Sequence, residues 1–228
     1  LFRSGSHERV LRGIEALRKH RVEYNALVLV SSANVDHART VYRYLLDLGI
    51  YHHQYIPCVE FDDAGAPLPF TVTGPQWGAF LTELFDEWYP GDVRKVSIRD
   101  FDAIVGHMVT GQYSMCVQQG KCNGYFVVEH NGDIYPCDFF VQPSTKLGSI
   151  LKDSWLELQQ SKRYEKFAAQ KSAWNEACAA CPYLRYCSGD CLKQRFHGGT
   201  RDSSQLSWLC EGWMQFYGLR AAQVMDIW

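Results

Sequence analysis

The chain has 228 residues, of which 46% are hydrophobic and 21% are charged, and its formal net charge is −2 at pH 7. No run of Lys and Arg exceeds two residues, so the sequence lacks the basic footprint of a protein that binds a phosphate backbone, and we expect no nucleic-acid partner. The longest aliphatic stretch, residues 26–30, is far too short to span a bilayer, and we expect no membrane association.

The N-terminal part of the chain alternates between helix and strand patterns. Residues 7–20, preceded by Ser6 as the expected N-cap, carry apolar side chains at helical spacing, and so do residues 36–48. The segments 24–31 and 51–58 read as strands, and the nearly continuous apolar character of 24–31 predicts burial on both faces. The order of strand, helix and strand predicts parallel βαβ units of an α/β sheet or barrel, although the segment is too short to close a barrel alone.

Two further helices and a hairpin are expected downstream. Residues 75–88 carry aromatic and aliphatic side chains on one helical face, and residues 101–110 predict a shorter helix. Residues 125–136 predict a β-hairpin, because Asn131-Gly132 suits the two positive-φ positions of a type I′ turn. The character of the sequence changes near residue 113, where we expect a domain boundary that separates residues 1–112 from residues 113–228.

Nine cysteines are the main anomaly of the composition. Their odd number and the absence of an apolar signal-peptide core at the start argue against a disulfide framework and favour a cytoplasmic protein whose thiols bind metal. Eight of them suit two four-ligand sites, and the spacing alone leaves zinc and iron–sulfur clusters open. The remaining thiol, Cys58, reads as a small core side chain. The eight follow the pattern Cys116-x5-Cys122-x14-Cys137, then Cys178-x2-Cys181-x5-Cys187-x3-Cys191, then Cys210.

Two segments carry a family resemblance. The run from Cys122 through the sequence Cys137-Asp138-Phe139-Phe140, and the later cysteine spacing that ends in Cys210-Glu-Gly, resemble the anaerobic sulfatase-maturating enzymes. These are radical S-adenosylmethionine (SAM) proteins with a C-terminal SPASM domain. The upstream residues resemble the later part of their barrel, so the resemblance covers essentially the whole chain. It implies that residues 1–112 are the C-terminal part of a partial (β/α)6 radical SAM barrel with linker helices, and that residues 113–228 are a SPASM domain.

The resemblance also implies roles for individual residues. It places two auxiliary 4Fe–4S clusters on two interleaved groups of cysteines. Asp138 is implied as the base that deprotonates the substrate side chain, because a carboxylate that is ionised at neutral pH is a suitable proton acceptor. Ile56 and Gln54 lie on the strand that contacts SAM in such barrels. The first cysteine set is Cys116, Cys122, Cys137 and Cys191, and the second cysteine set is Cys178, Cys181, Cys187 and Cys210.

The expected activity is an oxygen-independent oxidation of a Cys or Ser of a client sulfatase to Cα-formylglycine. One departure is that the chain lacks the Cys-x3-Cys-x2-Cys loop of the SAM-cleaving cluster, so we expect a fragment that is inactive alone. The full-length protein is expected to bind SAM and a third 4Fe–4S cluster, and to receive electrons from a flavodoxin or ferredoxin. Two alternatives stay open: a SPASM enzyme that cross-links peptides, and a non-enzymatic binding or carrier module stapled by zinc.

Overall fold

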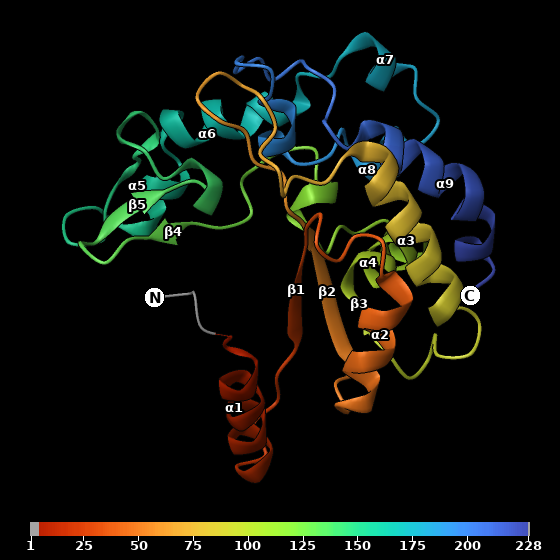
Figure 1. The fold of residues 1–228 in the computed structure, drawn as a ribbon. Coiled ribbons are helices and arrows are strands. Elements are labelled where there is room, and N and C mark those ends of the chain that lie inside the picture. The colour runs from red at the N-terminus through yellow and green to blue at the C-terminus, as the bar shows by residue number, and fades with distance from the viewer. Residues whose placement is uncertain (1–4, 228) are drawn as a thin grey trace.

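A computed structural model describes residues 5–227, and Figure 1 shows two differently built regions. The first, which we call the α/β layer, comprises residues 7–110 and the C-terminal helix. Its sheet has the order β1-β2-β3, and all three strands are parallel. The strands are β1 (Ala26–Val30), β2 (His52–Pro57) and β3 (Ser97–Ile98). The helices are α1 (His7–Lys19), α2 (Ala38–Asp47), α3 (Gly74–Trp88), α4 (Arg99–Thr110) and α9 (Cys210–Met225).

The four helices predicted from the sequence in this layer are confirmed. Gly49 follows α2 with a φ of +64°, a left-handed conformation that ends a helix at little cost for glycine. The α3 helix begins at a capping box, in which the Thr73 hydroxyl accepts from the Gln76 backbone N–H and the Gln76 side chain accepts from the Thr73 N–H. Ser6 occupies the N-cap position of α1, but its side chain makes no capping hydrogen bond.

The expected burial of the first strand on both faces is wrong. Leu27 and Leu29 are 62% and 58% exposed, whereas Val30 is fully buried. The reason is that β1 is an edge strand of this sheet, and the helices α2, α3 and α4 lie on one side of it in Figure 1. Side chains alternate between the two faces of a strand, so Leu27 and Leu29 point to the face that these helices do not cover.

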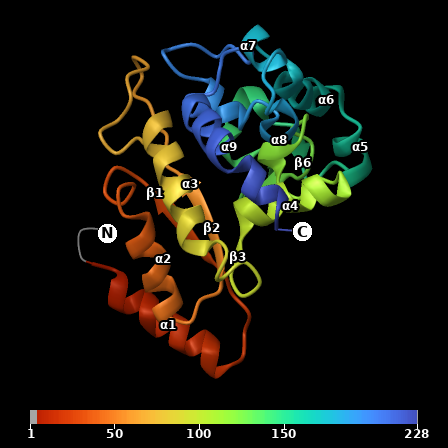
Figure 2. The same cartoon turned by 90° about the vertical axis from the view of Figure 1, so that its right-hand side faces the viewer.

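The core of the α/β layer is aromatic. Helices α3 and α9 lie side by side in Figures 1 and 2, and buried rings from both pack together with a ring from α4. The ring of Phe85 packs edge-on against those of Phe101 and Phe216, at centroid distances of 5.3 and 6.1 Å. The helix α9, which lies beyond the expected boundary near residue 112, therefore shares one core with the strands and helices before that boundary.

Glycines set the distance between α3 and α9. A Cβ added to Gly212 on α9 would lie 2.1 Å from the carbonyl oxygen of Gly74, and one added to Gly78 would lie 2.8 Å from the Cα of Gly212. A Cβ atom does not approach another heavy atom that closely, so the two backbones lie this near to each other only because these positions carry no side chain.

The second region, residues 113–209, is built from short elements, and we call it the cysteine-rich region. Its sheet is antiparallel, with the order β4-β5-β6. The strands are β4 (Val127–Val128), β5 (Asp133–Tyr135) and β6 (Gly148–Ser149). The helices are α5 (Trp155–Gln159), α6 (Lys162–Ala169), α7 (Glu176–Ala179) and α8 (Leu184–Cys187). The 3-10 turns are η1 (Cys116–Gln118), η2 (Asp138–Phe140), η3 (Pro143–Thr145), η4 (Gln170–Ser172) and η5 (Leu192–Arg195).

The predicted hairpin is present as β4 and β5, but its turn differs from the expected type I′. The Gly132 N–H bonds to the Glu129 carbonyl, and Gly132 has a φ of +83° while Asn131 does not have a positive φ. This is the pattern of a longer loop in which one glycine alone adopts the left-handed conformation. Asn131 instead uses its side chain, whose carbonyl oxygen accepts from the Asp133 N–H at 3.0 Å. The third strand, β6, was not predicted.

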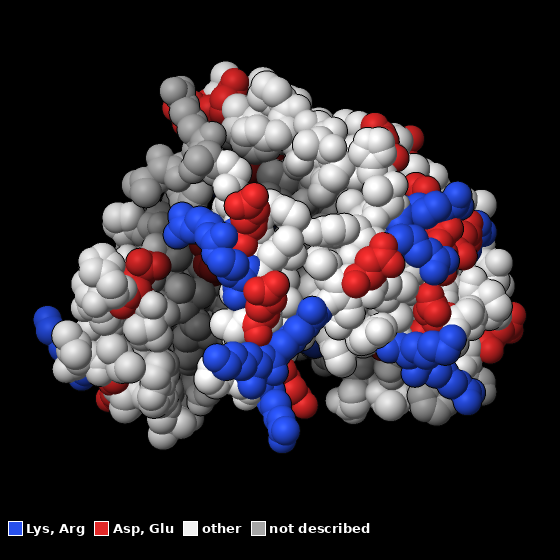
Figure 3. All heavy atoms as spheres, turned by 60° about the horizontal axis from the view of Figure 1, so that its bottom comes forward, with Lys and Arg blue, Asp and Glu red and all other residues white. Residues whose placement is uncertain are grey.

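The surface carries mixed charge. On the face shown in Figure 3, Lys and Arg side chains lie among Asp and Glu side chains and form no broad basic area. Basic residues lie in ion pairs on the α/β layer, where Arg39 and Arg43 contact Glu87, Lys95 contacts Asp92 and Arg220 contacts Asp86. Within residues 5–227, no helix is both long enough and apolar enough to cross a bilayer.

Candidate functional site

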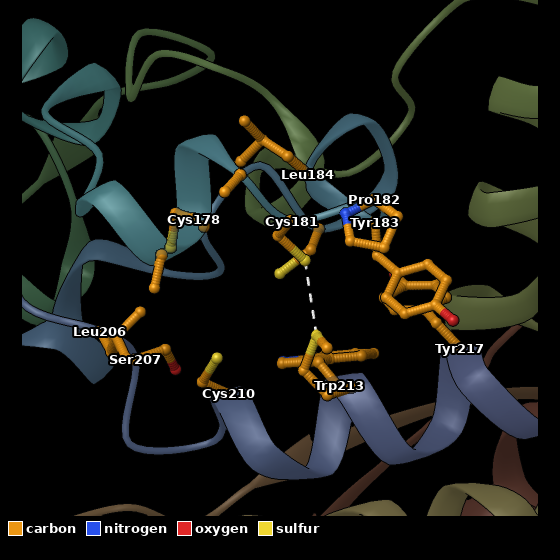
Figure 4. Close-up of a pocket in the computed structure, with 15 residues that line it drawn as sticks. Cys178, Cys181, Pro182, Tyr183, Leu184, Leu206, Ser207, Cys210, Trp213 and Tyr217 are labelled. Atoms are coloured by element: carbon orange, nitrogen blue, oxygen red, sulfur yellow. Dashed lines mark hydrogen bonds between the residues drawn. The ribbon is translucent and has the colours of Figure 1, made fainter.

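The second cysteine set lines a single cavity of about 320 Å³. Cys178 lies on α7, Cys187 is the last residue of α8, and Cys210 is the first residue of α9. Figure 4 shows Cys178, Cys181 and Cys210 pointing toward one another across the space between α7 and α9. Thiols that are far apart in the sequence are thus brought to one site by three helix ends.

The rest of the cavity wall is mainly apolar. The Cys181 thiol lies 3.4 Å from the Met214 sulfur, and Tyr183 and Trp213 close one side in Figure 4. An apolar wall around sulfur donors limits the access of water and so helps to set the redox behaviour of a bound group. The other apolar side chains in the wall are Ala177, Ala180, Pro182, Leu184, Leu206 and Tyr217.

Part of the first cysteine set lies beside a smaller apolar cluster, formed by the buried residues Phe140, Phe167 and Leu192. Cys122 and Cys137 pack against this cluster. The thiols of the first cysteine set also affect one another's pKa values. Burial first, and then Cys116 among other neighbours, raises the pKa of Cys122. Burial, then Asp190 and more weakly Cys122, raises the pKa of Cys191.

Burial leaves most of these thiols hard to ionise. It raises the pKa of Cys191 to about 12 and those of Cys137 and Cys210 to about 11. The same effect raises the pKa of Cys187 further. A metal binds the thiolate form, so loading such a site releases protons and compensates for the burial of the sulfur atoms.

The donor sets fit iron–sulfur clusters. Each set offers four soft sulfur atoms, which is the number that holds a 4Fe–4S cluster. The second set surrounds a cavity rather than a point. Among residues 5–227, no three Cys, His, Asp or Glu side chains converge closely enough to coordinate one metal ion. The assignment of each thiol to a cluster stays a prediction.

Asp138 lies next to the first cysteine set and is exposed. Its Oδ1 accepts hydrogen bonds from the Tyr125 hydroxyl at 3.1 Å and from the Cys137 thiol at 3.3 Å. The Tyr125 hydroxyl also lies 3.5 Å from the Cys137 sulfur. Tyr125 is itself anchored, because its backbone carbonyl accepts from the Tyr164 hydroxyl at 2.8 Å. The structure therefore holds the carboxylate in one place at the edge of the site. Tyr125 was not singled out from the sequence.

Gln54 and Ile56 share one face of β2. In the parallel register Leu27 lies beside Gln54, and Leu29 lies beside Ile56. This is the face that α2, α3 and α4 leave uncovered, and both side chains are half-buried there. Their partner on the opposite face, Tyr55, is buried against Phe80. The structure places the two predicted SAM-facing residues together on one face of β2, and neither lines the cavity of the second cysteine set.

Two buried cations between the cysteines were missed from the sequence. The side chains of Lys171 and Arg195 are 0% and 1% exposed. Lys171 Nζ donates to the Val117 and Asp190 carbonyls, each at 2.7 Å. No local sequence pattern predicts that a lysine is buried, because Lys is almost always found at the surface.

Comparison with known proteins adds the decisive observations. A family model for the SPASM iron–sulfur cluster-binding domain matches residues 116–182. A serine-type anaerobic sulfatase-maturating enzyme of Bacteroides thetaiotaomicron is 33% identical over 93% of this chain, and a cysteine-type enzyme of Clostridium perfringens is 31% identical over 96%. The chain is homologous to the anaerobic sulfatase-maturating enzymes. Residues 116–182 carry the match to an iron–sulfur cluster-binding domain, and the relatives include both serine-type and cysteine-type enzymes.

Solved structures agree with this relationship. The structure described as native anSMEcpe with bound AdoMet matches with a TM-score of 0.90 and 28% identity over 97% of this chain. The same protein with AdoMet and the Kp18Cys peptide also matches with a TM-score of 0.90. The chain spans 55% and 60% of the length of the two curated relatives and 61% of the solved chain. This partial coverage is consistent with the C-terminal portion expected from the sequence.

Proposed function

We propose that the protein is a radical SAM oxidoreductase that converts a Cys or Ser of a client sulfatase to Cα-formylglycine without oxygen. The proposal extends a property of the relatives to this chain, which would contribute the later part of a (β/α)6 barrel and the SPASM domain. The observation that carries it is the gathering of the second cysteine set around one cavity, on a chain whose homologues are sulfatase-maturating enzymes.

The cysteines would hold two auxiliary 4Fe–4S clusters, one on each set. When bound, such clusters and SAM supply one-electron chemistry and hydrogen-atom removal. The chain's own contribution is to fix the sulfur donors on rigid elements and to keep water away from them. The apolar wall of the 320 Å³ cavity serves the second purpose.

Asp138 is proposed as the proton acceptor. Conversion of the client side chain removes one hydrogen from Cβ, one further electron, and the proton of the thiol or hydroxyl. That proton needs a base within reach, and a carboxylate held by the Tyr125 hydroxyl is positioned to take it. We propose Tyr125 as a positioning residue, because its bond to Oδ1 leaves the other carboxylate oxygen available.

Gln54 and Ile56 are proposed to contact SAM on the uncovered face of β2. Ile56 offers an apolar surface for the adenine ring, and Gln54 offers an amide that donates and accepts hydrogen bonds. We further propose a client sulfatase polypeptide and a flavodoxin or ferredoxin as partners, in the cytoplasm. The solved relatives with bound peptides support a polypeptide client.

The test is to incubate the anaerobically reconstituted full-length protein with SAM, a reductant and two sulfatase-type peptides that differ only in Cys or Ser at the target position. Formylglycine is expected in at least one peptide, detected by mass spectrometry and by an aldehyde-reactive probe. Loss of two hydrogens without an aldehyde or thioaldehyde would instead indicate a peptide cross-linking enzyme. Zinc without acid-labile sulfide in the purified protein would indicate a metal-stapled module.

A further inference from the structure

Three consecutive residues connect the two cysteine sets. Ser188, Gly189 and Asp190 lie between Cys187 of the second set and Cys191 of the first, and all three have a positive φ, of 48°, 71° and 62°. Residues other than glycine rarely adopt a positive φ, so the surrounding structure must stabilise this turn. The turn is also the shortest covalent link between the two sets.

The carbonyls of this turn all bind buried cations. Arg195 donates to the Ser188 carbonyl at 3.2 Å and to the Gly189 carbonyl at 2.9 Å. Lys171 donates to the Asp190 carbonyl at 2.7 Å, and with its second bond it reaches Val117, the residue after Cys116 of the first set. The Lys171 ammonium therefore sits where the backbones that carry both sets converge.

The two cations lack a carboxylate partner. Among the described residues, no carboxylate oxygen lies within 4.0 Å of the Lys171 or Arg195 side-chain nitrogens. The one buried carboxylate of the region, Asp190, accepts instead from the Ser207 hydroxyl at 2.5 Å. A buried cation is costly unless an anion lies nearby, so this arrangement calls for further negative charge in the interior.

The thiolates are the source of that negative charge. Lys171 Nζ donates at 2.7 Å to the carbonyls of Val117 and Asp190, which neighbour Cys116 and Cys191 of the first set, and the Asp190 N–H in turn donates to the carbonyl of Cys187 of the second set at 2.8 Å. The Lys171 charge therefore lies within electrostatic range of both sets. Four thiolates around an iron–sulfur core leave a net negative charge, and each electron that the cluster accepts adds to it.

We propose that Lys171 is a positioning residue shared by both cysteine sets, whose fixed positive charge raises the reduction potential of both clusters. The inference rests on the proposed function, because it requires that the two sets hold iron–sulfur clusters. A buried charge near each cluster favours the reduced state of both, since the low dielectric of the interior screens it weakly. One side chain thus shifts the reduction potentials of the two clusters in the same direction.

The experiment compares Lys171→Met, which keeps the length but removes the charge, with Lys171→Arg, which keeps the charge. Lys121→Met is the matched control, because Lys121 precedes Cys122 but is exposed, so solvent screens its charge. Iron and acid-labile sulfide are measured on the reconstituted full-length protein, followed by potentiometric titration of both clusters monitored by electron paramagnetic resonance. For K171M we expect full iron content and, at a fixed potential, about a tenfold lower ratio of reduced to oxidised cluster at both sites, or about 59 mV for a one-electron couple.

K171R and K121M are expected to stay close to the wild-type potentials. Unchanged potentials in iron-replete K171M, or a shift at one cluster only, would overturn the shared role and leave the proposed function standing. Wild-type protein without iron or sulfide would overturn both. If K171M binds no cluster, restored clusters in K171R support the role of the charge, and their absence from K171R refutes it.

Discussion

The α/β layer and the cysteine-rich region bury different kinds of side chain. The first packs large rings such as Trp77, Phe80 and Phe85 into one core, whereas the second has a small apolar cluster and two buried cations bonded to backbone carbonyls. A core of rings is stabilised by its own burial, which contributes on the order of 1.5–3 kcal/mol for each large side chain. A region that buries charge instead depends on a partner for that charge. We therefore expect the α/β layer to respond most to loss of a buried ring, and the cysteine-rich region to respond most to loss of the negative charge that balances its cations.

Removal of metal tests the comparison most strongly. Protein prepared without iron, or treated with a chelator, is expected to lose protection from amide hydrogen exchange throughout residues 116–200, because the thiols of the two proposed sites and the two buried cations would lose their common partner. Helix α3 is expected to remain protected. Hydrogen exchange followed by mass spectrometry on the loaded and metal-free proteins measures both. Equal loss of protection in α3 would show that the two regions are not independent.

The substitution Asp138→Asn assigns the proton chemistry to the cysteine-rich region. It preserves the shape of the side chain but removes the acceptor, so we expect formylglycine formation to fall by about 100-fold or more while SAM cleavage continues. Asp226→Asn, at an exposed position after α9, is the control. Peptide product and 5′-deoxyadenosine are quantified in the same reaction. Product formation at the wild-type rate in D138N would exclude the role of base.

A pair of phenylalanine truncations compares the two cores directly. Phe85 is fully buried among four other rings, and Phe85→Ala is expected to lower the free energy of unfolding by about 3–5 kcal/mol. Phe167→Ala, in the smaller cluster, is expected to cost less in the metal-loaded protein, because the proposed metal sites would cross-link that region. Urea unfolding followed by tryptophan fluorescence gives both values. A larger loss in F167A would mean that the small cluster, not metal, stabilises its region.

The pH dependence of stability sharpens the account of the α/β layer. Burial raises the pKa of Asp100 to about 7, and its Oδ2 has no hydrogen-bond partner. The unfolded carboxyl titrates near 3.8, so between these values the folded protein binds the proton more tightly. The free energy of unfolding should therefore fall as pH rises from about 4 to about 7, by up to a few kcal/mol.

Asp100→Asn removes this titration. The difference in free energy of unfolding between the variant and the wild type is expected to change across that window and to be constant above it. Urea unfolding at about pH 5 and about pH 8 tests this. A difference that is the same at both values would mean that Asp100 titrates normally in the folded protein.

The regular elements could be predicted because their signals are local. The apolar stripes of α1 to α4 fix those helices without reference to the rest of the chain. The helix α9 was missed, because a helix that is apolar on several faces has no clear stripe. The exposure of Leu27 and Leu29 depends on which other strands lie beside β1, and no local pattern contains that information.

The thiols of the site were visible in the sequence, and their surroundings were not. Cysteine spacing predicts eight donors, but the cavity around the second set is made by three helix ends that only folding brings together. Tyr125 and Lys171 act through contacts to residues far away in the sequence, Tyr164 and Asp190 respectively. The turn at Asn131-Gly132 was mispredicted because the Asn131 side chain competes for the backbone N–H that follows.

The glycine contact between α3 and α9 has a consequence for the order of assembly. Gly212 lies two residues after Cys210, so the helix that presents this thiol is seated directly on the backbone of α3. The last donor of the second set is therefore delivered by the α/β layer, and the layer has to be folded before four sulfur atoms face one another. A cluster proposed at this site is therefore expected to load only after α9 is seated on α3.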